Sequence, residues 1–111
     1  MAKTHKKTAK DPFMLERFAT EEVLHSTLTR LRGRYSVLTV LEKNKERPNV
    51  ERIDYYRSRI SEISAFMDAI INSPIDEKKI AIKLYSKELR TLLEESFAEN
   101  YKNRIRNFPR S

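Results

Sequence analysis

Apolar residues recur every three or four positions along two long stretches of the chain, which is the spacing of one face of an α-helix. The first seam follows Thr20, and the second runs from about Val50 to Ile71. The seams consist of Leu24, Leu28, Leu31, Tyr35 and Leu38, and of Ile53, Tyr56, Ile60, Ile63, Met67 and Ile70. Because Pro48 separates them within a short polar stretch, we expect the two helices to form an antiparallel hairpin.

Capping residues indicate where these helices begin. Asp11 and Pro12 form a helix start, since Asp caps a helix and Pro fits its first position, and Thr20 is a second candidate cap. The sequence therefore predicts a short N-terminal helix after Pro12, followed by the first long helix. Asn49 can cap the second long helix.

The segment from Glu77 to about Asn107 places apolar residues on several sides of a helix. We expect it to bend near Ser86 and Lys87 or to contact two neighbours. Ile80, Ile82 and Leu84 alternate as in a strand, but the length of the segment favours a helix.

These patterns predict an all-α fold, a helical bundle built on a long antiparallel helical hairpin plus a third long helix and a short N-terminal helix. A single glycine among 111 residues agrees with few turns. We divide the chain into a flexible basic arm (1–11), a single helical domain (12–108) and a C-terminal tail (109–111). The heptad-like seams suggest coiled-coil packing and allow an oligomer.

Composition narrows the environment and the chemistry. The chain has no cysteine, which excludes disulfides and thiolate zinc sites, and no apolar run approaches the ~18 residues of a membrane span. The basic N-terminus has no apolar region typical of a secretory signal. We expect an intracellular protein, cytoplasmic or nuclear (nucleoid), that does not act at a membrane.

Catalytic and metal-binding motifs are weak. Gly33 stands alone, so a glycine-rich phosphate loop does not fit. Glu22 and His25 have the spacing of one half of a di-iron motif, but a second histidine for the other half is missing. We expect no enzyme activity, no catalytic residue, no cofactor or metal, and no small-molecule substrate.

Clustered positive charge is the strongest functional signal, with a net charge of +7. Antiparallel pairing would bring basic residues of the two long helices close together, and both ends of the chain are basic. The candidate contacts are Lys3, Lys6, Lys7 and Lys10 in the arm, Arg30, Arg32, Arg34, Arg52, Arg57 and Arg59 in the hairpin, and Lys102, Arg104 and Arg106 near the C-terminus. This pattern predicts nucleic-acid binding through the phosphate backbone with weak sequence preference. The same residues could instead serve solubility or cover the helix seams with their aliphatic stems.

A second hypothesis is a protein-interaction subunit that docks or self-associates through apolar helix faces. Residues Ile53–Ile60, Ser73–Glu77 and Leu84–Leu89 resemble the helical domain of GINS subunits of the replicative helicase complex. The resemblance covers about half of the chain and has no counterpart to the β-domain of those subunits. It implies a structural subunit of a replication assembly. A small phage-type inhibitor of a host protein would have a similar sequence.

Overall fold

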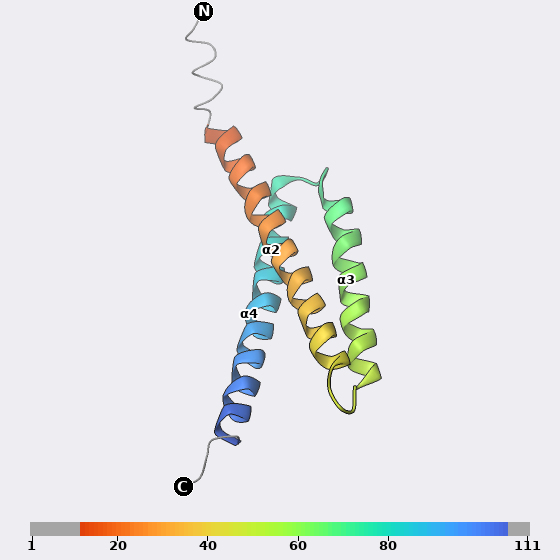
Figure 1. The fold of residues 1–111 in the computed structure, drawn as a ribbon. Coiled ribbons are helices and arrows are strands. Elements are labelled where there is room, and N and C mark those ends of the chain that lie inside the picture. The colour runs from red at the N-terminus through yellow and green to blue at the C-terminus, as the bar shows by residue number, and fades with distance from the viewer. Residues whose placement is uncertain (1–11, 107–111) are drawn as a thin grey trace, which may run out of the picture.

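The computed structural model describes residues 12–106, with side chains described as far as residue 95 (Figure 1). Three helices make up nearly all of this region: α2 (Pro12–Lys43), α3 (Val50–Ile70) and α4 (Ile75–Arg106). No strand occurs within residues 12–106, so the all-helical prediction is confirmed for that range. The arm at 1–11 and the tail at 109–111 lie outside the described residues.

The prediction of a separate short N-terminal helix is wrong, because Pro12–Lys43 is one helix of 32 residues. Thr20 does not cap a new helix. Its buried hydroxyl donates a hydrogen bond of 2.8 Å to the carbonyl oxygen of Glu16, one turn back in the same helix. No proline lies between Pro12 and Pro48, so nothing interrupts the helix.

The turn between α2 and α3 is fixed by a cap and a buried carboxylate. Asn49 caps α3 as predicted, since its side-chain oxygen accepts from the backbone N–H of Arg52 at 3.2 Å. Glu42 is buried near the C-terminal end of α2, where the helix dipole disfavours an anion. Lys45 and Arg52 compensate this charge, at 3.2 and 3.6 Å from its carboxylate oxygens.

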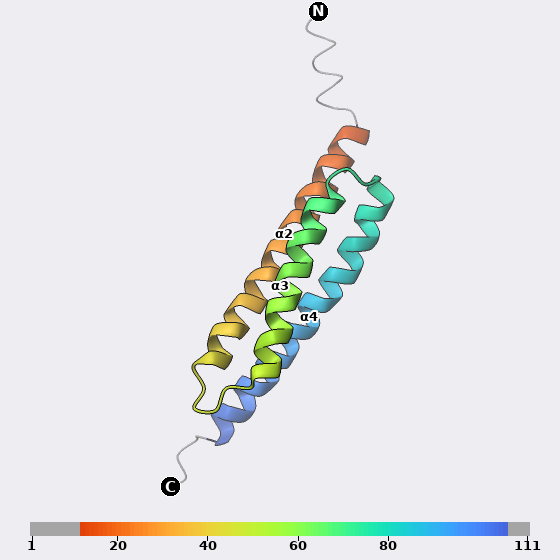
Figure 2. The ribbon, with the colours of Figure 1, turned by 90° about the vertical axis from the view of Figure 1, so that its right-hand side faces the viewer.

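The central helix is α2, and both other helices pack against it. Figures 1 and 2 show that α3 runs opposite to α2, whereas α4 runs in the same direction as α2. In the view of Figure 1, α2 and α4 cross near their N-terminal ends and separate toward their C-terminal ends. This leaves α2 with one outer side that neither α3 nor α4 covers.

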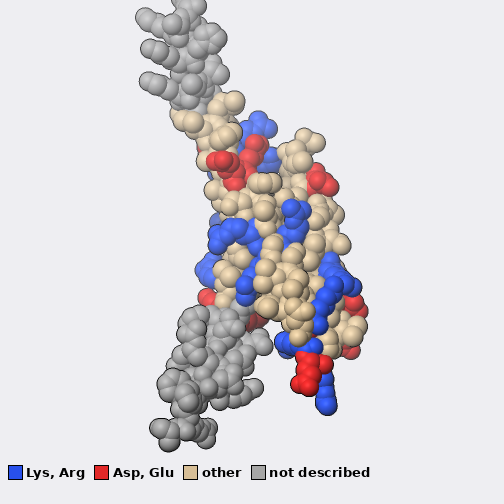
Figure 3. All heavy atoms as spheres, in the orientation of Figure 1, with Lys and Arg blue, Asp and Glu red and all other residues tan. Residues whose placement is uncertain are grey.

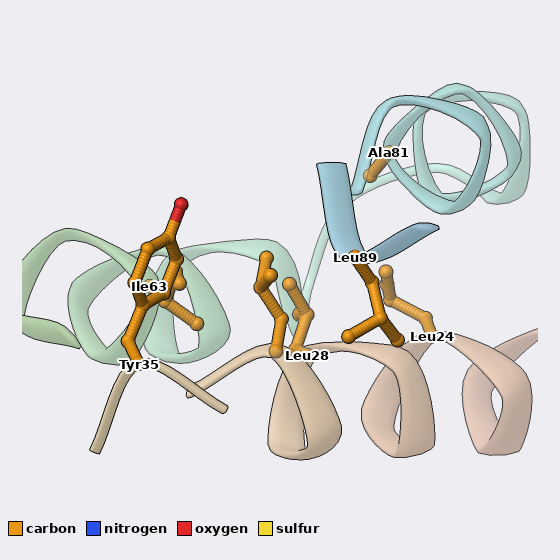
Figure 4. Close-up of a cluster of buried hydrophobic side chains, with 7 residues drawn as sticks. Leu24, Leu28, Tyr35, Ile63, Ala81 and Leu89 are labelled. Carbon is orange, nitrogen blue, oxygen red and sulfur yellow. The ribbon is translucent and has the colours of Figure 1, made fainter. Parts of the chain in front are cut away.

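The core is small and gathers where the three helices meet. In Figure 4, Leu24, Leu28 and Tyr35 project from α2 toward Ile63 of α3 and toward α4, which contributes Ala81 and Leu89. Leu31 is also fully buried. The first seam therefore supplies most of the core, and the third helix completes it.

Lys78 of α4 ties all three helices together at the end of the bundle where α3 stops. Its buried ammonium lies 3.0 Å from the carboxylate of Glu21 in α2 and donates a 3.0 Å hydrogen bond to the carbonyl oxygen of Ile71. That carbonyl belongs to the C-terminal end of α3, which needs such a donor. The hydrogen bond from Lys78 lowers the pKa of Glu21 below its usual value.

No bend separates the two halves of α4, which continues through Ser86 and Lys87. Its apolar residues face two neighbours instead. Tyr85 packs on Phe66 of α3 with ring centroids 5.0 Å apart, while Leu89 joins the core built on α2. None of the helices over residues 12–106 is apolar over enough length to cross a membrane.

Candidate nucleic-acid interface

Two of the six predicted hairpin arginines are held in ion pairs. Arg52 pairs with buried Glu42, as described above. Arg59 is largely buried, and its Nη2 lies 2.6 Å from Oε1 of Glu88 in α4, with a further ion pair to Glu62. A guanidinium engaged in this way has little capacity left for a phosphate.

Glu88 is the centre of this network because it also accepts a 2.6 Å hydrogen bond from the hydroxyl of Tyr35 in α2. The Arg59 guanidinium carbon lies 5.9 Å from the centre of the Tyr35 ring. Burial, and then the Glu88 carboxylate, raise the pKa of Tyr35 well above its ordinary value. Burial alone would lower the pKa of Arg59, but its interactions with Glu88, Tyr35 and Glu62 raise it instead. The network joins all three helices and has a structural role.

The arginines that flank Gly33 point to two different sides of α2. Arg32 donates through Nη1 to the hydroxyl of Ser64 in α3 at 3.3 Å, so it lies on the α3 side. Arg30 and Arg34 follow Glu16 by close to four and five whole helical turns. Arg30 and Arg34 therefore lie on the flank of α2 where Glu16 pairs with Lys79 of α4, opposite the flank that carries Arg32.

Arg57 belongs with Arg32 rather than with Arg30 and Arg34. It precedes Ser64 by seven residues, or two helical turns, so it shares the side of α3 that adjoins α2. Arg57 is exposed and has no ion pair with any residue over 12–95. The structure therefore separates the predicted hairpin cluster into different locations.

α4 supplies two basic residues that the sequence reading missed. Lys83 and Arg90 follow Lys79 by four and eleven residues, so they are exposed on the flank of α4 that carries Lys79, the partner of Glu16 in α2. Since α2 and α4 run in the same direction, the basic residues of α2 and those of α4 form two rows that run the same way. We call Arg30, Arg34, Lys83 and Arg90 the basic face.

No member of the basic face forms an ion pair with the residues whose side chains are described. Acidic residues are absent from positions 23–41 of α2 and from 78–87 of α4. In the view of Figure 3, with α2 in front of α4, Lys and Arg spheres lie over the middle of the helices and Asp and Glu spheres nearer their ends. This surface is a local concentration of uncompensated positive charge.

Arg34 has a further unsatisfied group. Its Nε is buried and lacks a hydrogen-bond partner within the described part of the chain. The side chain is therefore partly covered, although no described residue accepts a hydrogen bond from this Nε. A buried N–H without a partner is unfavourable by about 1–3 kcal/mol.

Gly33 lies on the uncovered outer side of α2. Its φ is not positive, and a Cβ built there would meet nothing within 4 Å. Neither the backbone conformation nor internal packing therefore requires glycine. In a helix interior, glycine costs about 1 kcal/mol relative to alanine.

The remaining predicted contacts lie outside the residues whose side chains are described. Lys3, Lys6, Lys7 and Lys10 lie outside the described residues. Lys102, Arg104 and Arg106 belong to the last turns of α4, where the backbone alone is described. The sequence signal that could have revealed Lys83 is the acid-free lysine stretch at 78–87, whereas Arg90 follows Glu88 and has no such signal.

A groove of about 930 Å³ lies on the side of the molecule where α3 and α4 separate. Tyr35 and Leu38 of α2 contribute to its lining, as do Tyr55 of α3 and Leu84 of α4. Its charges are mixed, because Glu51, Glu88 and Glu95 lie beside Arg52 and Lys87. A groove with these carboxylates is a poorer site for a polyanion than the basic face.

Within the described residues, no three His, Cys, Asp or Glu side chains gather closely enough to hold a metal ion. Comparison with known proteins identified no matching family, no matching curated protein and no matching solved structure. The GINS resemblance stays a prediction.

Proposed function

We propose that this chain is a non-enzymatic binding protein that holds nucleic acid through its phosphate backbone. The observation that supports this proposal is the basic face, where four cationic side chains have no ion-pair partner among the described residues and three of them, Arg30, Arg34 and Lys83, lie within acid-free stretches of α2 and α4. Guanidinium groups donate paired hydrogen bonds to phosphate oxygens, and three of these four residues are arginines. Contacts of this kind fix position without reading base sequence.

The other basic residues extend the proposal. Arg57 and Arg32 lie across the outer side of α2 from the basic face, close enough to add long-range attraction. The lysines of residues 1–11 and the basic residues near the C-terminus would add contacts along the phosphate backbone of the same nucleic acid. Arg52 and Arg59 are left out, because each already balances a carboxylate of the bundle.

Binding to short duplex DNA, single-stranded DNA and RNA, measured by fluorescence anisotropy at two salt concentrations, tests the proposal. Each phosphate contact contributes about −0.9 to the logarithmic salt slope on duplex DNA. Four contacts therefore predict roughly 100-fold weaker binding at about 200 mM than at about 50 mM salt. Absence of binding at the lower salt, or binding indifferent to salt, would contradict the proposal.

A second candidate is a protein-interaction subunit, favoured by apolar side chains that the bundle leaves in solvent. Leu84 and Tyr55, which line the groove, are 64% and 55% exposed. Met14, Leu15 and Phe18 are exposed near the start of α2. An assembly subunit or an inhibitor would use such surfaces. This candidate becomes the better one if nucleic acid does not bind at low salt.

A further inference from the structure

Gly33 is surrounded by arginines on the side of α2 that faces away from the bundle. Successive residues of a helix are rotated by about 100°, so Arg32 and Arg34 point to opposite sides of Gly33. Arg30 lies on the same side as Arg34. The result is a low point in the helix surface, with the exposed glycine between two arginine flanks.

Among the described residues, nothing compensates the destabilising effect of this glycine. Glycine is commonly required in a helix where the backbone turns to positive φ or where a neighbouring segment approaches closely. Neither applies at Gly33, where the φ is not positive and the space beyond Cα is open. A binding partner that approaches the helix backbone at this point would explain why position 33 is a glycine.

We infer that a phosphodiester strand of nucleic acid lies against the α2 backbone at Gly33, between Arg32 on one flank and Arg30 and Arg34 on the other. This inference rests on the proposed function and adds the point of closest approach. A side chain at position 33 would hold the strand away from the helix axis. The flanking guanidinium groups would then reach phosphate oxygens at longer distance and poorer angle, which weakens each contact.

Two substitutions separate this role from a structural one. Gly33→Ala is expected to raise the thermal unfolding midpoint by a few degrees, because alanine is the better helix former. The same change should weaken binding to a fluorescent single-stranded or duplex oligonucleotide by about 3-fold, and Gly33→Leu by about 10-fold or more. Both variants keep the net charge. A variant that is more stable yet binds less well identifies a contact.

Ala69→Leu is the matched control, since Ala69 is exposed on α3 and the change adds similar bulk. It should change the dissociation constant less than about 2-fold, as is usual away from a contact. If the wild-type chain binds and Gly33→Leu binds equally well, or if Ala69→Leu weakens binding as much, the inference is overturned and the proposed function stands. If the wild-type chain does not bind the oligonucleotide at about 50 mM salt, both are overturned.

Discussion

Replacing Arg30, Arg34 and Arg90 with Gln is expected to weaken nucleic-acid binding by about 100-fold at about 50 mM salt. Each arginine would lose a charged contact with a phosphate, and about 1 kcal/mol for each of three contacts corresponds to that factor. The salt slope on duplex DNA should fall by about three, because fewer counterions are released. Fluorescence anisotropy over a salt series measures both quantities.

A control variant with the same charge change separates the basic face from net charge. Lys43, Arg47 and Lys87 are exposed, lie near the α2–α3 turn or in the groove, and form no ion pair with the described residues. Replacing these three with Gln also lowers the net charge by three. Binding should then fall less than 10-fold, through the loss of long-range attraction. Equal losses in the two variants would mean that charge alone matters and that the basic face is not a site.

Replacing Glu88 with Ala is expected to lower the free energy of unfolding by about 2–4 kcal/mol. Arg59 would lose its main counter-charge while its side chain stays 17% exposed, and Tyr35 would lose the acceptor for its buried hydroxyl. A domain with such a small core has little stability to spare. Urea denaturation followed by circular dichroism measures the change, with the midpoint shifted and the slope preserved.

Glu62→Ala is the control, because Glu62 is the other carboxylate of Arg59 but is 61% exposed. Its loss should cost less than about 1 kcal/mol, as for surface ion pairs. Glu88→Gln keeps an acceptor for Tyr35, so its free energy of unfolding should lie between those of the two alanine variants. This variant provides the measurement if Glu88→Ala does not fold. If Glu62→Ala and Glu88→Ala are equally stable, the network does not hold the helices together.

The helical architecture could be predicted because its causes are local. Pro48 lies in the turn that follows the end of α2 at Lys43, and Asn49 starts α3 through its side-chain cap. Leu24 and Leu28 lie in the core, as the periodicity of the first seam indicated. Thr20 misled the prediction, since a threonine hydroxyl can cap a helix or bond one turn back inside it, and only the structure distinguishes the two.

The location of the charged side chains depends on how the third helix docks, and no local pattern gives that. The sequence suggested that Arg59 is an exposed arginine, but in the structure Glu88 of α4 forms an ion pair with it. Lys83 and Arg90 were overlooked because the predicted cluster was built from two helices, whereas the seam beside Arg30 and Arg34 is formed by α4. Composition indicated a basic protein, but the way the helices pair decides which basic side chains have no carboxylate partner.

The most direct test of the central claim is to map the bound nucleic acid on the protein by NMR. Backbone amide shifts of the ¹⁵N-labelled full chain would be followed during titration with a short oligonucleotide at about 50 mM salt. The proposed function predicts that the largest changes fall on α2 around residues 29–37 and on α4 around 83–90. Changes confined to the chain ends, or concentrated along the groove at residues 49–56 of α3, would contradict it.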